Sequence, residues 1–344
     1  MSIKVAIIGC GSIAEFRHAP EYYENPNVVI AGFYDKHYER AEKLAKKFGG
    51  KVYLNLEEIM KDETINAISD CTSNETHVLV STEALNHGKH VLCEKPIATT
   101  LEDAEKILNA VEKSNKIFMV DYNQRLADAH KKAKEILKTG ELGKVLTFST
   151  TFGHKGPEYW SATKGNSTWF FKKNRSVLGV AADLGIHKID LLRYILDDEF
   201  DEVFAFEAVL DKKDEFNNPI EVCDNFICLL KTKKGVLGTG TFSWTYYGDE
   251  DNSTILYCQK GILKIYDNPE FPIIIDKGKE KVYYRLDSIQ TNENQTKSGV
   301  IDEFVNCIIK GSKPFATVYD GVAALKVIIK AMESARTGNK IKIV

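Results

Sequence analysis

Short apolar runs alternate with longer amphipathic segments from residue 3 to about residue 120. The longer segments place apolar residues at helical spacing, as in His37–Phe48, Thr76–Asn86 and Leu101–Ser114. Thr100 and Asp103 resemble a capping box at the start of the last of these. Buried strands joined by crossover helices form a parallel, doubly wound sheet. The pattern predicts an α/β domain over residues 1–121, with strands at Ile3–Ile8, Val28–Tyr34, Val52–Tyr53, Ile65–Ser69, His90–Cys93 and Ile117–Val120.

The pattern changes after Asp121. A helix is predicted at Asp128–Lys138 and a strand at Lys144–Phe152, followed by a loop rich in glycine, lysine and tryptophan. Six runs then follow one another with only turns between them, and strands joined so closely are antiparallel. We expect residues 122–344 to form an α+β domain with a large, mainly antiparallel open sheet. Its strands are predicted at Glu202–Leu210, Glu221–Lys231, Gly235–Trp244, Ser253–Cys258, Ile262–Tyr266 and Lys281–Leu286, and its last helices at Gly299–Ile309 and Asp320–Arg336.

Composition narrows the class of protein. The 344 residues are 43% hydrophobic, which suits two ordinary globular domains. The 46 basic and 49 acidic residues give a net charge of −3 without a block of like charge, so we expect neither a nucleic-acid nor a membrane partner. The seven cysteines contain no C-x-x-C and favour reduced structural thiols, with a metal site or redox pair as the alternative. No metal is predicted, and the absence of a signal-peptide pattern favours a cytoplasmic location.

The first strand leads into a dinucleotide-binding pattern. Gly9-Cys10-Gly11-Ser12-Ile13-Ala14 reads G-x-G-x-x-A. Gly9 permits the tight turn, Gly11 lets the backbone approach a pyrophosphate, and Ala14 lets helix and strand pack closely. Asp35, at the end of the second strand, supplies a carboxylate for the ribose 2′-hydroxyl and favours NAD, with NADP still possible because Lys36 follows. The alternative is a glycine-rich turn beside a solvated carboxylate.

Two further segments carry candidate chemistry. Lys95 follows the fifth strand, at the edge where open α/β sheets bind ligands, and Pro96 fixes the exit of the strand with a bond that can be cis. Asp183 and His187 share one face of a predicted helix that runs to about Leu196, where the carboxylate can tune the imidazole as a proton acceptor. The alternatives are a solvated lysine and a histidine packed behind a helix start.

Five segments together resemble the Gfo/Idh/MocA oxidoreductases, the family of glucose-fructose oxidoreductase and inositol 2-dehydrogenase. The resemblance covers nearly the whole chain and implies a Rossmann-fold domain. It is carried by Gly9–Ala14, Thr72-Ser73-Asn74-Glu75-Thr76-His77, Gly88–Pro96 with its Glu-Lys-Pro ending, Asn123-Gln124-Arg125, and Asp183–Asp190.

The resemblance implies roles for single residues. Lys95 and His187 flank the reacting carbon, with Lys95 also bridging the cofactor to the substrate, and Asp183 is the third catalytic residue. The nicotinamide side of the site is lined by Glu94, Asn74, His77 and Asn123, with Thr72 in the same cofactor-binding segment and Trp169 as an aromatic neighbour.

The chain also departs from the family pattern. Relatives often carry three glycines before the Asp-x-Gly-x-His element, where this chain has Val177-Leu178-Gly179-Val180-Ala181-Ala182. Residues 153–160 lie where relatives have a substrate loop, and they suit a polyhydroxylated ligand or an ordinary surface loop equally.

The leading hypothesis is an NAD(P)-dependent dehydrogenase acting on a CH–OH group, which transfers hydride between the nicotinamide and a secondary hydroxyl of a sugar, sugar derivative or cyclitol. Two alternatives remain: an NAD-dependent glycoside hydrolase that oxidises its substrate transiently, and a non-catalytic NAD-binding sensor. No segment is left to cover one face of the second sheet. We therefore expect a homodimer or homotetramer formed through that sheet.

Overall fold

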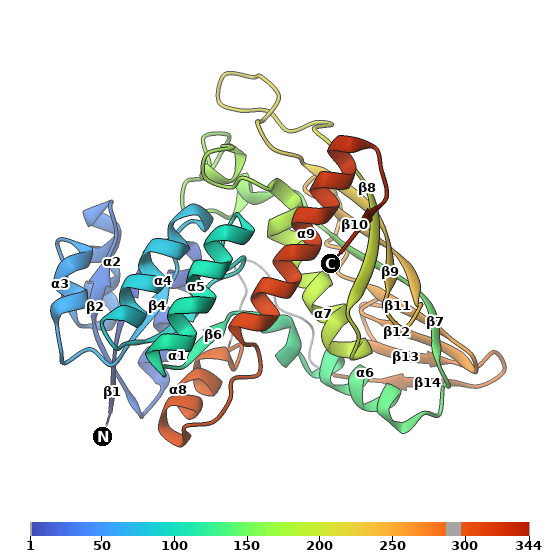
Figure 1. Ribbon diagram of the computed structural model, residues 1–344, viewed down its shortest axis with the longest axis horizontal. Helices are drawn as coiled ribbons and strands as arrows, with labels where there is room; N and C mark the ends of the chain where they lie inside the picture. Colours follow the sequence, from blue (N-terminus) through green and yellow to red (C-terminus); the bar gives the residue numbers. More distant parts are fainter. Residues whose placement is uncertain (1, 287–296, 344) are drawn as a thin grey trace. The chain divides into compact units, whose positions relative to one another are not determined.

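The computed structural model describes residues 2–286 and 297–343 (Figure 1). Two compact units emerge from it. The first contains Met1–Asn123, Trp160–Ala162 and Gln290–Ala323, and the second contains Gln124–Tyr159, Thr163–Ile289 and Ala324–Val344. The expected domain boundary between residues 121 and 122 stays a prediction.

The first unit contains a six-stranded sheet in the order β3-β2-β1-β4-β5-β6, with every neighbouring pair parallel. This confirms the doubly wound sheet, whose strand order reverses direction between β1 and β4. The sequence also predicts the bounds of β1, β2 and β5 as they are found. The strands are β1 Ile3–Ile8, β2 Val28–Tyr34, β3 Lys51–Val52, β4 Ala67–Asp70, β5 His90–Cys93 and β6 Phe118–Val120.

Helices of the first unit pack in two groups, as right-handed crossovers require. α4 packs against α3 and α5, whereas α1 packs against α2 and α8. Thr100 Oγ1 accepts the N–H of Asp103 at the start of α5, which confirms the predicted cap. The helices are α1 Ala19–Glu24, α2 Tyr38–Phe48, α3 Leu56–Lys61, α4 His77–Asn86, α5 Leu101–Ser114 and α8 Val300–Lys310.

Hydrogen bonds join α1 to the segment around α8. Asn25 Nδ2 donates to Asp302 Oδ1 at 2.7 Å, and the N–H of Ser298 donates to Glu21 Oε1 at 2.7 Å. The first unit is therefore completed by residues far along the chain.

The second unit contains a nine-stranded sheet in the order β14-β13-β12-β11-β7-β10-β9-β8-β15. Most neighbours are antiparallel, which confirms the predicted sheet, but β7 and β10 are parallel. A tight turn joins β9 to β10 as a hairpin, closed by a bond from the N–H of Gly235 to the carbonyl of Thr232. The strands are β7 Val145–Gly153, β8 Phe200–Ala208, β9 Asn225–Thr232, β10 Leu237–Ser243, β11 Thr254–Cys258, β12 Gly261–Ile265, β13 Ile273–Asp276, β14 Lys281–Tyr284 and β15 Ile341–Lys342.

Helices pack on the sheet of the second unit, and one set of strand side chains remains exposed. α6 (Asp128–Thr139) contacts α7 (Ile186–Leu196), β12 and β13, and α7 also contacts β7. Phe226, Cys228 and Leu230 of β9 are buried, whereas the alternating Ile227 and Leu229 are about half exposed. The longest helix, α9, spans Val318–Thr337.

All seven cysteines are free thiols, and every one but the half-buried Cys258 is buried. Burial raises the pKa of Cys258 to about 11 and that of Cys228 to about 12. Thiols with such high pKa values are poor nucleophiles, which agrees with a structural role. Within residues 2–286 and 297–343, every helix is too short or too polar to cross a lipid bilayer.

Candidate active site

The turn after β1 has the geometry that a dinucleotide requires. Gly9 adopts a φ of +87°, and a Cβ at this position would lie 2.5 Å from the carbonyl oxygen of Cys71, which follows β4. A Cβ on Gly11 would meet no atom within 4 Å. Gly9 is thus required by the turn itself, and Gly11 leaves open space where a pyrophosphate can approach the backbone. The chain continues into a π-helical turn, Ala14–His18, before α1 begins.

Asp35 lies at the end of β2 and binds the glycine turn. Its Oδ2 accepts the N–H of Cys10 at 2.7 Å, and its Oδ1 accepts the N–H of His37 at 2.8 Å. These bonds fix the carboxylate and leave lone pairs for further donors. Ser12 Oγ donates to the carbonyl of Trp160 at 3.0 Å, so the hydroxyl is used within the first unit.

Hydrogen bonds hold the backbone on both sides of Lys95, directly after the end of β5. Glu94 Oε2 accepts the N–H of Lys95 at 3.2 Å. The peptide bond between Lys95 and Pro96 is cis, as the sequence allowed. Nδ1 of the buried His77 lies 2.7 Å from the carbonyl oxygen of Pro96, and its Nε2 lies 3.1 Å from that of Thr72. His77 therefore connects two strand-end loops, and its contact with the cofactor stays a prediction.

The remaining cofactor-binding candidates of the first unit also follow strand ends. Thr72 Oγ1 donates to Asp70 Oδ1 at 2.7 Å, and Asn74 is buried in the short turn before α4. Asn123 follows β6, and its Oδ1 is buried with no hydrogen-bond partner among the residues that the structure describes. A buried amide oxygen without a donor at this edge of the sheet fits a cofactor group that donates hydrogen bonds. The open space at Gly11, the fixed Asp35 and this oxygen together fit NAD.

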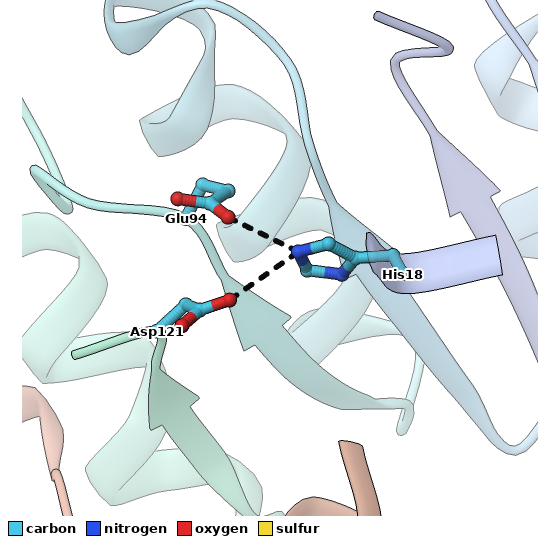
Figure 2. Close-up of side chains that lie close together, drawn as sticks. All are labelled: His18, Glu94 and Asp121. Atoms are coloured by element: carbon cyan, nitrogen blue, oxygen red, sulfur yellow. Dashed lines mark hydrogen bonds and ion pairs between the residues drawn. The ribbon is translucent and has the colours of Figure 1, made fainter. Parts of the chain in front are cut away.

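Glu94 belongs to a buried cluster of charged side chains that the sequence did not predict (Figure 2). Nε2 of the fully buried His18 lies 3.0 Å from Glu94 Oε1 and 3.3 Å from Asp121 Oδ2. Arg17 Nη1 lies 3.6 Å from the same oxygen of Asp121. One feature of the sequence could have indicated this cluster: His18 closely follows the glycine turn, and a carboxylate directly follows each of β5 and β6.

The charges of this cluster compensate one another. Burial disfavours the protonated form of His18, but Cys71 and hydrogen bonds to Asp121 and Glu94 outweigh it and raise the pKa of His18 well above its usual value. Burial likewise raises the pKa of Asp121, but Arg17 and His18 lower it more, so the net shift is downward. Two cations therefore face two carboxylates in a buried site.

The same cluster has donor types that metals bind. The potential ligand atoms of His18, Glu94 and Asp121 lie within 4.8 Å of one another. Imidazole and carboxylate ligands suit Zn²⁺, but Arg17 and the protonated His18 already neutralise the carboxylates. That the chain needs no metal stays a prediction.

Asp183 and His187 lie in the second unit on the predicted helix, whose first part is π-helical. Asp183 belongs to a π-helical turn, Ala181–Gly185, and the α-helix starts at Ile186. Asp183 Oδ2 accepts a hydrogen bond from Trp244 Nε1 at 3.0 Å. His187 is half-buried, with its ring centroid 6.0 Å from that of Phe152. The segment thus presents a fixed buried carboxylate and a more accessible imidazole four residues later.

Two buried ion and hydrogen-bond systems hold α7, and neither was predicted. Lys188 Nζ, fully buried, donates to the carbonyls of Asn252 and Ser253 and to Thr254 Oγ1 at 2.7 to 3.3 Å. Burial lowers the pKa of Lys188 to about 7, despite the opposing effect of Asp251. Asp190 forms a two-pronged ion pair with the guanidinium of Arg125. These contacts fix the turn of α7 that directly follows His187.

The loop before Asp183 has a backbone that suits glycine. Val177 adopts a φ of +62° and Gly179 one of +55°. A Cβ on Gly179 would lie 2.5 Å from the carbonyl oxygen of Cys223. The chain therefore replaces a glycine-rich loop with one that keeps glycine where backbone crowds it and holds one valine in a strained conformation.

Part of the expected substrate loop is occupied by an internal ion pair. Lys212 Nζ pairs with Glu158 and donates to the carbonyl of Lys155 at 2.7 Å. His154 is buried, and its Nδ1 accepts the N–H of Gly156. Trp169 stacks on Phe170 at 3.9 Å between ring centroids. Substrate binding by this loop and a nicotinamide contact by Trp169 stay predictions.

A parallel sheet of order 3-2-1-4-5-6 with a glycine turn after β1 defines the class of Rossmann-fold dinucleotide-binding proteins. Residues 3–122 match the family model described as oxidoreductase family, NAD-binding Rossmann fold, and residues 130–264 match the GFO/IDH/MocA C-terminal domain. The chain belongs to the Gfo/Idh/MocA oxidoreductase family. The predicted family, the oxidoreductase class and NAD as cofactor are confirmed.

Relatives match either the whole chain or part of it. Myo-inositol 2-dehydrogenase of Thermotoga maritima is 24% identical over 347 residues, which cover 99% of this chain and 98% of the relative. Levoglucosan dehydrogenase of Pseudarthrobacter phenanthrenivorans is 32% identical over 174 residues, or 50% of this chain and 43% of the relative. A levoglucosan dehydrogenase solved with NADH and levoglucosan has a TM-score of 0.85 at 21% identity, with 99% of both chains covered, which shows the shared fold.

Proposed function

We propose that this protein is an NAD-dependent dehydrogenase that transfers hydride reversibly between a secondary hydroxyl of a sugar, sugar derivative or cyclitol and the cofactor. The observation that carries the proposal is that each of the two units holds some of the residues that hydride transfer requires. The first unit holds the glycine turn and the fixed Glu94-Lys95-Pro96 segment, and the second holds Asp183 and His187 on an anchored helix. The names of the relatives, which include inositol and levoglucosan dehydrogenases, support this substrate class.

The roles follow from the chemistry of the side chains. NAD, when bound, supplies the hydride acceptor. His187 accepts the hydroxyl proton as the C–H hydride leaves the same carbon, so alcohol becomes ketone and the charges balance. The Lys95 ammonium stabilises the developing alkoxide. Asp183, whose carboxylate accepts a hydrogen bond from Trp244, is proposed as the third catalytic residue, with the role of holding the imidazole or a substrate hydroxyl.

We also propose that NAD is preferred to NADP. The Asp35 carboxylate, already oriented by two backbone amides, can accept the hydrogen bonds of the ribose hydroxyls. The same charge repels a 2′-phosphate.

A second copy of the chain is the partner we propose for the exposed sheet face. In the strand register, Phe206 lies opposite Ile227. Thr147 lies opposite both Leu237 and Tyr257 on its two neighbouring strands. These side chains all point to the same face of the sheet. The large apolar residues among them, with Leu229, are each at least 40% exposed. An apolar surface spread over adjacent strands marks an interface.

A spectrophotometric screen tests the activity. The protein is incubated with NAD or NADP and a panel containing myo-inositol, levoglucosan, D-glucose and glucose 6-phosphate, and reduction is followed at the nicotinamide absorbance. We expect NAD reduction with at least one polyol. Release of free sugar from a glycoside without net reduction would instead support the hydrolase alternative, and NADH binding without any turnover would support the sensor.

A further inference from the structure

His18 connects the glycine-turn helix to the Lys95 segment through a continuous set of hydrogen bonds. Its Nδ1 lies 2.7 Å from Ser69 Oγ at the end of β4, and its Nε2 lies 3.0 Å from Glu94 Oε1. The other oxygen of Glu94 accepts the backbone N–H of Lys95. One carboxylate therefore joins the imidazole of His18 to the amide of Lys95.

The cluster leaves Glu94 little freedom to move. His18 is fully buried, and Glu94 is 7% exposed. Asp121 and Arg17 complete a site in which two cations face two carboxylates. Moving Glu94 away would leave a buried charge without its partner, which is unfavourable in a site from which water is excluded. Removing the charge of His18 releases this constraint.

On the other side of Lys95, the buried His77 holds the carbonyl of Pro96 at 2.7 Å. Lys95 is thus a half-buried residue, and its two neighbours in the chain, Glu94 and Pro96, are each held by a different histidine. The two anchors differ: His77 contacts backbone, whereas His18 acts through the side chain of Glu94.

We propose that His18 is a positioning residue for Lys95: through Glu94, its imidazole fixes the backbone from which Lys95 presents its ammonium to the reacting oxygen. This inference rests on the proposed function, in which Lys95 is catalytic. Small displacements of a catalytic group cost rate without a comparable loss of ground-state binding. His18→Gln is therefore expected to reduce kcat rather than cofactor affinity.

A double-mutant cycle tests this role. kcat is measured with the panel compound of highest turnover for the wild type, His18→Gln, Lys95→Ala and the double variant. NADH affinity is measured by fluorescence titration and the unfolding midpoint by circular dichroism. We expect His18→Gln to lower kcat by roughly 10- to 100-fold, while the NADH dissociation constant changes by less than about 3-fold. In the Lys95→Ala background the same substitution is expected to change kcat by less than about 3-fold.

His90→Gln is the matched control, because His90 is a half-buried histidine at the opposite end of β5 whose Nδ1 accepts the N–H of Ile117. It is expected to keep kcat within about 3-fold of the wild type. If His18→Gln does not fold, Glu94→Gln replaces it with the same expected non-additivity.

Different results overturn different statements. Unchanged kcat in His18→Gln, or an equal loss of kcat in both backgrounds, overturns the positioning role alone. Near-normal kcat in Lys95→Ala overturns the catalytic assignment in the proposed function, and the positioning role with it.

Discussion

The carboxylate of Asp35 and the backbone amide of Cys10 are joined by a 2.7 Å hydrogen bond, which ties the end of β2 to the middle of the glycine turn. The charge that is proposed to select NAD is therefore also a structural acceptor. Asp35→Asn removes the charge while its single amide oxygen can still accept the N–H of Cys10, at the loss of the acceptor for the N–H of His37.

We expect Asp35→Asn to weaken the use of NAD and improve that of NADP, changing the ratio of their kcat/KM values by at least about 10-fold, which corresponds to roughly 1.4 kcal/mol. Steady-state kinetics with both cofactors measure the ratio. Glu39→Gln, on the nearby surface of α2, serves as the control for a general change of charge. A ratio that stays the same in Asp35→Asn would remove Asp35 from the selection of the cofactor.

Lys95→Ala and His187→Ala are expected to bind NADH with near-normal affinity while kcat falls by about 10²- to 10⁴-fold, because each removes a group that acts on the reacting oxygen. Fluorescence titration of NADH, performed beside the rate assay, separates binding from turnover. Retention of near-normal rates by both variants would disprove the catalytic assignment.

The buried Lys188 predicts how stability changes with pH. Its pKa is about 7 in the folded protein, below the ordinary value of about 10.4 in an unfolded chain. Between these values the unfolded chain binds more protons, so this group makes the free energy of unfolding rise with pH from about 7 to about 10.

Lys188→Met is expected to lose that rise. Relative to the variant, the wild type gains roughly 3 kcal/mol between pH 7 and 9.5. Urea unfolding at both pH values measures the difference, and the exposed Lys138→Met gives the control. Parallel pH profiles for the wild type and Lys188→Met would show that the lysine does not titrate in this range.

A charge on the exposed sheet face tests the proposed assembly. Ile227, half exposed on β9, lies opposite Phe206. Ile227→Glu is expected to shift the protein from an oligomer to a monomer of 38.7 kDa, because it places an unpaired carboxylate in an apolar interface. Sedimentation velocity at micromolar concentration measures the mass. A wild-type protein that sediments as a monomer would contradict the assembly itself.

Local pattern was sufficient for elements whose burial alternates or repeats regularly. Ile3–Ile8 and Leu101–Ser114 have the predicted bounds because buried parallel strands and capped helices carry strong local signals. The short β13 was missed, since its few apolar residues follow a proline and lack a hairpin signal. The parallel pairing of β7 with β10 was missed for another reason. It joins strands that are distant in sequence, and no local pattern encodes it.

The residues of the candidate site also divide into those that a local sequence pattern predicts and those that only the folded chain brings together. Gly9, Gly11 and Asp35 were found because the glycine turn requires them at fixed spacing. The ion cluster of His18 was not found, because its carboxylates lie 76 and 103 residues further along and meet only in the folded sheet. Lys188 was overlooked because a lysine in a polar-looking position is normally exposed, and only the tertiary structure shows the three oxygens that receive it.

The contacts of Asn25 with Asp302 and of Glu21 with Ser298 also constrain how this protein is made in the cell. Each pair is separated by 277 residues, a length that ribosomes take roughly 15 to 55 seconds to translate at 5 to 20 residues per second. During that interval the nascent nucleotide-binding unit lacks its α8 contacts, so the surface of α1 is open to chaperones until translation is nearly finished.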